Sequence, residues 1–113
     1  MEIQVLSLND ALEIMKNPEH DSLIVWYATW SAPSACFLRN LKEMPEIENV
    51  KIYKIDIENP PIELDRLRKL GVNSIPTSFF LKKGIKEKPR RITGNLNYEK
   101  ILRNFRMLQN FKS

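Results

Sequence analysis

Three residue types that small proteins use to brace a fold or to do chemistry are scarce here: one cysteine, one histidine and three glycines occur in 113 residues. The lone Cys36 excludes an internal disulfide and a cysteine-based zinc site, which takes about two to four cysteines. The single His20 has no second ligand or nucleophile spaced to it, so we expect no metal site and no cofactor. The fold therefore has to depend on the packing of its hydrophobic core.

Long apolar runs and linkers are absent as well. No stretch approaches the roughly 18 apolar residues of a membrane span, and residues 1–15 show no basic leader followed by an apolar stretch. Internal repeats and low-complexity tracts are also missing. At this length one modest core is the norm. We therefore expect a single domain over residues 1–113 that lies in the cytoplasm and does not contact a membrane.

Charge is unevenly distributed along the chain, although the net charge is only +4. Residues 1–65 contain 5 basic and 12 acidic side chains, whereas residues 66–113 contain 13 basic and 2 acidic ones. The stretch 82–91 alone holds six basic residues. Such a strip can contact nucleic-acid phosphates, but it has no aromatic residue and no recognised nucleic-acid motif. We interpret it as a charged sheet edge, where Pro89 also fits, and expect no nucleic-acid partner.

Hydrophobic periodicity predicts alternating strands and helices. Strands are predicted over residues 3–6, 23–28, 50–57 and 79–81, and a turn at Lys83 and Gly84 leads into a last strand that ends near residue 94. Helices are predicted from a cap at Ser7 or Asn9 to residue 17, and over residues 31–44, 59–71 and 97–111. The order is βαβαβαββα, an α/β fold. Residues 23–28 are apolar without alternation, which is typical of a central strand covered on both faces, and the predicted core aromatics are Trp26, Tyr27, Phe79 and Phe80.

The helix over residues 31–44 has a well-defined start. Ser31 can cap free backbone N–H groups, and Pro33 is tolerated in the first turn because no intrahelical donor is needed there. At about 100° per residue, Ser34 points in the same direction as the apolar residues of this helix, whereas Cys36 lies about 200° away from it. We therefore predict that Ser34 is buried and that Cys36 is a bystander.

These segments resemble the thioredoxin family. Residues 25–34 look like its central strand and active-site turn, with Trp30 and Pro33 in their motif places and with Ser31 and Ser34 where the family carries its two cysteines. Residues 75–77, Ile-Pro-Thr, are similar to the family's cis-proline loop, and Gly94 matches the glycine before its last helix. The resemblance implies the thioredoxin fold, a central mixed sheet flanked by helices on both faces.

The resemblance also implies a function, namely protein-disulfide oxidoreductase activity in cell redox homeostasis. In that family the first cysteine attacks a substrate disulfide as a thiolate and the second resolves the mixed disulfide. The catalytic positions are then Ser31 and Ser34, and the implied substrate contacts are Trp30, Ala32, Pro33, Ile75 and Pro76. The implied partners are protein substrates bound as an extended strand and a thioredoxin reductase.

Two departures from the family concern the chemistry. A serine hydroxyl is not ionised at neutral pH and forms no mixed bridge with sulfur, so we predict that the chain is redox-inactive with Ser31 and Ser34. Val25 stands where thioredoxins commonly hold a buried aspartate, although Lys54 resembles the lysine that accompanies it.

The two serines have more than one explanation. Serine is favourable at a helix start, which accounts for Ser31 but not for Ser34 on the apolar side. The other two explanations are that both serines are engineered replacements of cysteine, or that they are natural residues of a protein that binds without reacting. The first alternative predicts an oxidoreductase seen without its cysteines, and the second predicts a non-catalytic partner-binding module.

Overall fold

The computed structural model describes residues 1–86 and 88–109. In chain order, the elements are β1 (Gln4–Val5), α1 (Leu8–Lys16), β2 (Asp21–Tyr27), α2 (Ala32–Glu43), β3 (Val50–Asp56), α3 (Leu64–Leu70), β4 (Thr77–Leu81), β5 (Arg90–Thr93) and α4 (Tyr98–Gln109). The predicted βαβαβαββα order is confirmed. Phe111, predicted at the end of the last helix, and Glu87, within the basic stretch, lie outside the described residues.

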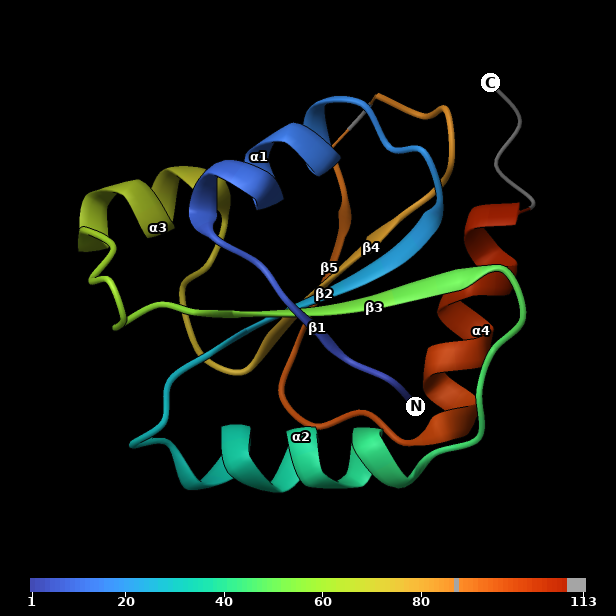
Figure 1. Ribbon diagram of the computed structural model, residues 1–113, viewed down its shortest axis with the longest axis horizontal. Coiled ribbons are helices and arrows are strands. Elements are labelled where there is room, and N and C mark those ends of the chain that lie inside the picture. The colour runs from blue at the N-terminus through green and yellow to red at the C-terminus, as the bar shows by residue number, and fades with distance from the viewer. Residues whose placement is uncertain (87, 110–113) are drawn as a thin grey trace.

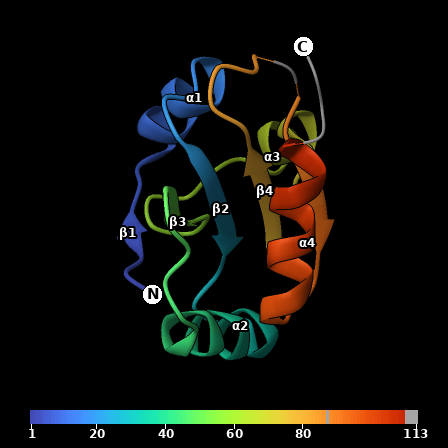
Figure 2. The same ribbon diagram turned by 90° about the vertical axis from the view of Figure 1, so that its right-hand side faces the viewer.

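The strands form one mixed sheet in the order β1-β3-β2-β4-β5. β1, β3 and β2 run parallel, whereas β4 is antiparallel to both of its neighbours. Helices α1 and α3 cover one face of the sheet, and α2 and α4 cover the other (Figures 1 and 2). The prediction of a mixed sheet flanked by helices on both faces is therefore confirmed. No helix within the described part of the chain is long and apolar enough to cross a bilayer.

β2 lies at the centre of the core, as its unalternating apolar sequence predicts. Its residues alternate between two clusters, because successive side chains in a strand point to opposite faces. Trp26 packs on the α1 and α3 side, with its ring centroid 5.3 Å from that of Phe79. On the opposite face Phe80 contacts Phe105 of α4 edge-on at 5.1 Å. Three of the four predicted core aromatics are fully buried, and Tyr27 is half-buried at the end of the strand.

The predicted start of α3 is wrong. The helix begins at Leu64 rather than at residue 59. The reason is a turn that periodicity does not reveal: Glu58 bridges to Pro61, and the Ile62 N–H donates to the Ile57 carbonyl at 2.8 Å. These contacts hold residues 58–62 outside the helix. The predicted end is confirmed, because Gly71 closes the helix in the left-handed conformation that glycine favours, with φ 95°.

The predicted turn at Lys83 and Gly84 is confirmed, because the Ile85 N–H donates to the Lys82 carbonyl at 3.1 Å, but the last strand does not follow it directly as predicted. β5 begins only at Arg90, so Pro89 precedes the strand instead of lying within it. The loop is held against the start of β2, because the Gly84 N–H donates to the Pro18 carbonyl at 2.9 Å and the Lys83 N–H to an Asp21 carboxylate oxygen at 2.8 Å. β5 itself is an exposed edge strand, as the charge pattern predicts.

Candidate functional site

The turn that follows β2 brings together the first group of predicted site residues, residues 30–34. Ser31 is the N-cap of α2: its Oγ accepts a hydrogen bond from the Ser34 N–H at 3.2 Å. The Ser31 N–H in turn donates to the Ala28 carbonyl at 3.1 Å, which fixes the end of the strand against the start of the helix. Ser31 is buried, whereas Ala32 and Pro33 are exposed. The predicted capping role of Ser31 is confirmed.

Ser34 points into the protein and is fully buried together with Phe37 and Leu41. Its Oγ finds no hydrogen-bond partner among the described residues. A buried hydroxyl without a partner is costly, whereas a thiol is a weak donor that is common in protein cores. The environment of Ser34 therefore suits a cysteine better than a serine. Cys36 is exposed, in agreement with its predicted position away from the apolar side of the helix.

Val25 and its neighbours form an apolar floor beneath this end of the sheet. Val25 is fully buried and packs in one cluster with Phe37, Leu41 and Phe80. Ser78 lies directly opposite Val25 in the β2–β4 pair, and its Oγ is also buried without a partner within the described residues. Sequence reasoning did not single out Ser78, because a serine on a strand carries no signal of its own. The floor thus contains hydroxyl groups but no carboxyl group at position 25.

Lys54 lies opposite Val25 in the parallel β2–β3 pair. Its Nζ lies 5.6 Å from the centroid of the Tyr27 ring, within the range of a cation–π contact. Burial raises the pKa of Tyr27, and the Asp56 carboxylate raises it further. The ammonium group of Lys54 is therefore directed to an aromatic ring at the edge of the core.

The Ile75–Pro76 loop is the second group of predicted site residues, and its peptide bond is cis. Because Trp26 pairs with Thr77 in the antiparallel β2–β4 register, Pro76 comes at the same end of the sheet as the 30–34 turn (Figure 1). The Gly94 N–H donates to the Pro76 carbonyl at 2.8 Å. The Arg91 guanidinium donates to the Gly71 carbonyl at 2.9 Å, at the start of the connection from α3 to β4 that contains Pro76.

Trp30 supplies apolar surface at this turn. Trp30 is 70% exposed and lies three residues after the end of β2. The exposed Ala32 and Pro33 follow it in the same turn. Chain continuity therefore joins Trp30, Ala32 and Pro33, and the strand register adds Ile75 and Pro76 to the same end of the sheet.

The chemistry open to Ser31 and Ser34 is limited by what surrounds them. A serine nucleophile needs a general base within hydrogen-bond reach. His20, the single histidine, precedes β2 while Ser31 follows it, and a strand of this length spans roughly 20 Å. No cluster of three metal-ligating side chains occurs in residues 1–86 and 88–109. Among the described residues, the Ser31 Oγ accepts the Ser34 N–H and the Ser34 Oγ has no partner, so neither hydroxyl is hydrogen-bonded to a base.

No family model and no curated protein matches the sequence, but solved structures match over nearly the whole chain. The chain is similar to chloroplastic thioredoxin z, with 19% identity and a TM-score of 0.79 over 98% of this chain and 97% of that one. It is similar to the thioredoxin of Trypanosoma brucei brucei, with 18% identity, a TM-score of 0.74, and 97% and 93% coverage. For thioredoxin O2 of Arabidopsis thaliana the identity is 26%, the TM-score 0.66, and the coverage 97% and 95%. The chain has the thioredoxin fold.

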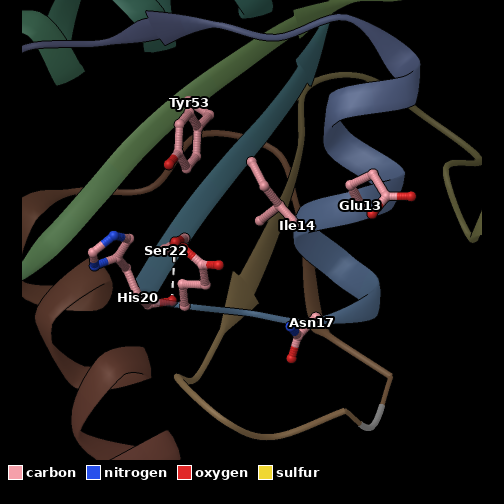
Figure 3. Close-up of a pocket in the computed structure, with 7 residues that line it drawn as sticks. Glu13, Ile14, Asn17, His20, Ser22 and Tyr53 are labelled. Carbon is pink, nitrogen blue, oxygen red and sulfur yellow. Dashed lines mark hydrogen bonds between the residues drawn. The ribbon is translucent and has the colours of Figure 1, made fainter.

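Sequence reasoning missed a hollow at the amino end of β2, opposite the end that carries the 30–34 turn. A pocket of roughly 310 Å³ lies beside the end of α1 (Figure 3), and its lining includes Glu13, Ile14, Asn17, His20, Ser22 and Tyr53. We call it the α1 pocket. His20 is exposed in the loop before β2, and it borders this pocket. The sequence feature that could have indicated it is the pair of acidic residues Glu13 and Glu19, one on each side of the predicted helix end.

Proposed function

We propose that this chain is a thioredoxin-type protein that binds an extended polypeptide segment at the 30–34 turn and the Ile75–Pro76 loop, and that it belongs to the protein-disulfide oxidoreductases. With Ser31 and Ser34 it performs no thiol–disulfide exchange. The observation that carries the proposal is the capped start of α2 at the same end of the sheet as a cis-proline loop. A cytoplasmic location is part of the proposal.

The start of α2 is suited to a thiolate at position 31. Backbone N–H groups and the positive end of the helix dipole face the first residues of a helix, and both stabilise an anion. The Ser31 Oγ already accepts the Ser34 N–H, so a sulfur there would receive the same donor. A cysteine at position 31 would attack, and one at position 34 would resolve the mixed disulfide from its buried position.

Polypeptide binding needs no thiol. An extended strand is bound mainly through backbone hydrogen bonds, with apolar side chains beside it. The backbone of Ile75 offers such groups next to Pro76, and Trp30 offers exposed apolar surface at the turn. Trp30, Ala32, Pro33, Ile75 and Pro76 are therefore the proposed contacts.

A second candidate, a naturally non-catalytic binding module, is favoured by the floor of the site. Val25 is fully buried among apolar side chains, so position 25 offers no carboxyl group to manage the proton of a resolving cysteine. The codons at positions 31 and 34 of the natural gene separate the two candidates. Cysteine codons mean an oxidoreductase whose cysteines were replaced, whereas serine codons favour the binding module.

The decisive experiment is to restore both thiols. We expect the S31C/S34C variant to catalyse thiol-dependent reduction of a protein disulfide, whereas the unchanged chain and S34C alone remain at the background rate. A thioredoxin reductase tested as the electron source identifies the reductant. A folded S31C/S34C variant that stays at background contradicts the oxidoreductase proposal.

Binding is tested separately on the unchanged chain. An extended peptide titrated into isotope-labelled protein is expected to shift the amide resonances of Ile75 and Thr77, and W30A is expected to weaken the peptide. M107A is the matched control, because Met107 is also exposed but lies on α4. Equal losses in W30A and M107A would argue against a binding site at the turn.

A further inference from the structure

The α1 pocket opens at the amino end of β2, away from the 30–34 turn. Ile14 projects from α1 toward the Tyr53 ring of β3, and His20 and Ser22 lie below the Tyr53 hydroxyl (Figure 3). The Ser22 Oγ donates its proton to the His20 carbonyl at 3.1 Å, so only its acceptor capacity is left for a ligand. The pocket is thus a polar hollow with apolar contact from Ile14 and an aromatic ring.

The groups around this pocket favour a positive charge. Glu13 and Glu19 carry carboxylates, and none of the lining residues is a lysine or an arginine. α1 ends at Lys16 with Asn17 as its C-cap, and Asn17 lines the pocket. The last carbonyl groups of a helix lack intrahelical partners and form the negative end of its dipole. Side-chain charge and helix polarity therefore act in the same direction.

Tyr53 gives the pocket an aromatic ring and a phenol hydroxyl. Tyr53 is only 9% exposed and lines the pocket, and its hydroxyl is not among the fully buried polar atoms without a partner, so it is accessible from the pocket. Burial raises the pKa of Tyr53, and the nearby Glu19 carboxylate raises it further, so the phenol is neutral at neutral pH. A neutral phenol oxygen accepts hydrogen bonds, and the ring face attracts a cation.

We propose that the α1 pocket binds an alkylammonium or guanidinium group, with Glu19 as its counter-ion, the Tyr53 ring and hydroxyl as its polar wall, and Ile14 against its methylene stem. Long cationic side chains bury their stems on apolar surface and keep the charged end with polar groups. The same chemistry occurs in a lysine or arginine side chain of a protein partner and in a free diamine. This site is separate from the proposed polypeptide-binding site and does not depend on it.

The chain's own cations are the competitors for this pocket. Lys51 lies two residues before Tyr53 on β3 and therefore on the same face of the sheet, but it is exposed and does not line the pocket. Lys83 is held nearby, because its N–H bonds to Asp21. The K51M variant should accordingly bind an external cation at least as tightly as the unchanged chain.

The test uses the full chain labelled with nitrogen-15 and three probes: capped glycyl-lysyl-glycine, the same tripeptide with norleucine in place of lysine, and putrescine. We expect the lysine tripeptide to shift the amide resonances of Asn17, Ser22 and Tyr53 saturably, and the norleucine tripeptide to shift none of them. Tighter binding of the lysine tripeptide than of putrescine indicates a protein partner, and the reverse order indicates a free amine; both support the site.

Two variants decide whether the pocket is responsible. E19Q should weaken the lysine tripeptide by about fivefold, the loss of one partly exposed ion pair. E43Q, an exposed residue of α2 on the other face of the sheet, should change the affinity by less than about twofold. Absence of saturable shifts, equal shifts from the norleucine tripeptide, or equal effects of E19Q and E43Q overturns the proposal.

Discussion

The two ends of β2 differ in the helix terminus that they meet. β2 is followed by α2, so the start of a helix lies at its carboxyl end, and it is preceded by α1, so the end of a helix lies at its amino end. Helix starts favour anions and helix ends favour cations. One strand therefore separates a site suited to a thiolate, at position 31, from one suited to an ammonium group, at the α1 pocket.

The side chains strengthen this difference at one end only. At the amino end, Glu13 and Glu19 add negative charge to the end of α1. At the carboxyl end, Ser31 and Ser34 are neutral, and Val25 is apolar beneath them. Helix polarity is set by the order of the elements. It therefore persists at the start of α2, although Ser31 and Ser34 there are neutral.

The largest expected effect comes from placing a charge at the carboxyl end. V25D should lower the free energy of unfolding by about 3 kcal/mol at neutral pH, because a carboxylate loses its hydration in the apolar cluster. Burial raises the folded-state pKa of the new carboxyl above its unfolded value of about 4. The cost should therefore be smallest at acid pH and grow as the pH rises above 4.

Denaturant unfolding at several pH values measures this cost. V25N, which adds a polar group that does not ionise, is the control and should show no such pH dependence. Because Lys54 lies opposite position 25, adding K54M to V25D should cost about 1 kcal/mol more. If V25D lowered the free energy of unfolding by the same amount at acid and neutral pH, position 25 would not lie in an apolar environment.

The next effect concerns the cap of α2. S31A should destabilise the protein by about 1 kcal/mol, because the Ser34 N–H loses its acceptor. S7A is the matched control at the other helix start, since the Ser7 Oγ accepts the Asp10 N–H at 3.1 Å. Chemical denaturation should give similar losses for both. A loss in S7A without one in S31A would mean that the turn gains nothing from its cap.

A smaller effect of opposite sign is expected three residues further on. S34A should stabilise the protein by about 0.5 kcal/mol, because it removes a buried hydroxyl that has no partner within the described residues. S22A is the control, since Ser22 is equally buried but bonds the His20 carbonyl, and it should destabilise by about 1 kcal/mol. If the midpoint of thermal unfolding shifted in the same direction for both variants, the expected difference between Ser34 and Ser22 would be contradicted.

The smallest effect is electrostatic and lies at the amino end. E19Q should lower the pKa of Tyr53 without returning it to its usual value, because burial is the larger cause of the raised pKa. The pKa of Tyr27 should not change, since Asp56 is the carboxylate that acts on it. Ultraviolet titration of the phenols measures both. A raised folded-state pKa also means that stability falls as the pH rises above about 10.

Local patterns predicted those parts of the molecule that depend on neighbours in sequence. The 100° helical period correctly separated the buried Ser34 from the exposed Cys36, and the apolar run through Val25 correctly marked the central strand. The start of α3 was predicted wrongly, because the bond from Ile62 to Ile57 competes with helix formation and leaves no periodic signal.

Contacts between distant segments were beyond such patterns. The α1 pocket exists because the parallel register pairs Ile24 with Tyr53 and so brings β3 beside the end of α1. The antiparallel β2–β4 register, which pairs Ser22 with Leu81, likewise brings the loop after β4 to Pro18. The roles of Ser31, Ser34 and the other site residues are predictions from resemblance, and they await the experiments on restored thiols and peptide binding.

Two hydrogen bonds that β5 and the residue after it make to the connection before β4 have a consequence for the order of assembly. Gly71 and Pro76 both receive their donors from residues about 20 positions later in the chain, Arg91 and Gly94. During synthesis, Pro76 emerges before either donor has been made. A nascent chain that stops at β4 thus contains every residue proposed to contact a substrate, but lacks the Gly94 N–H that donates to the Pro76 carbonyl.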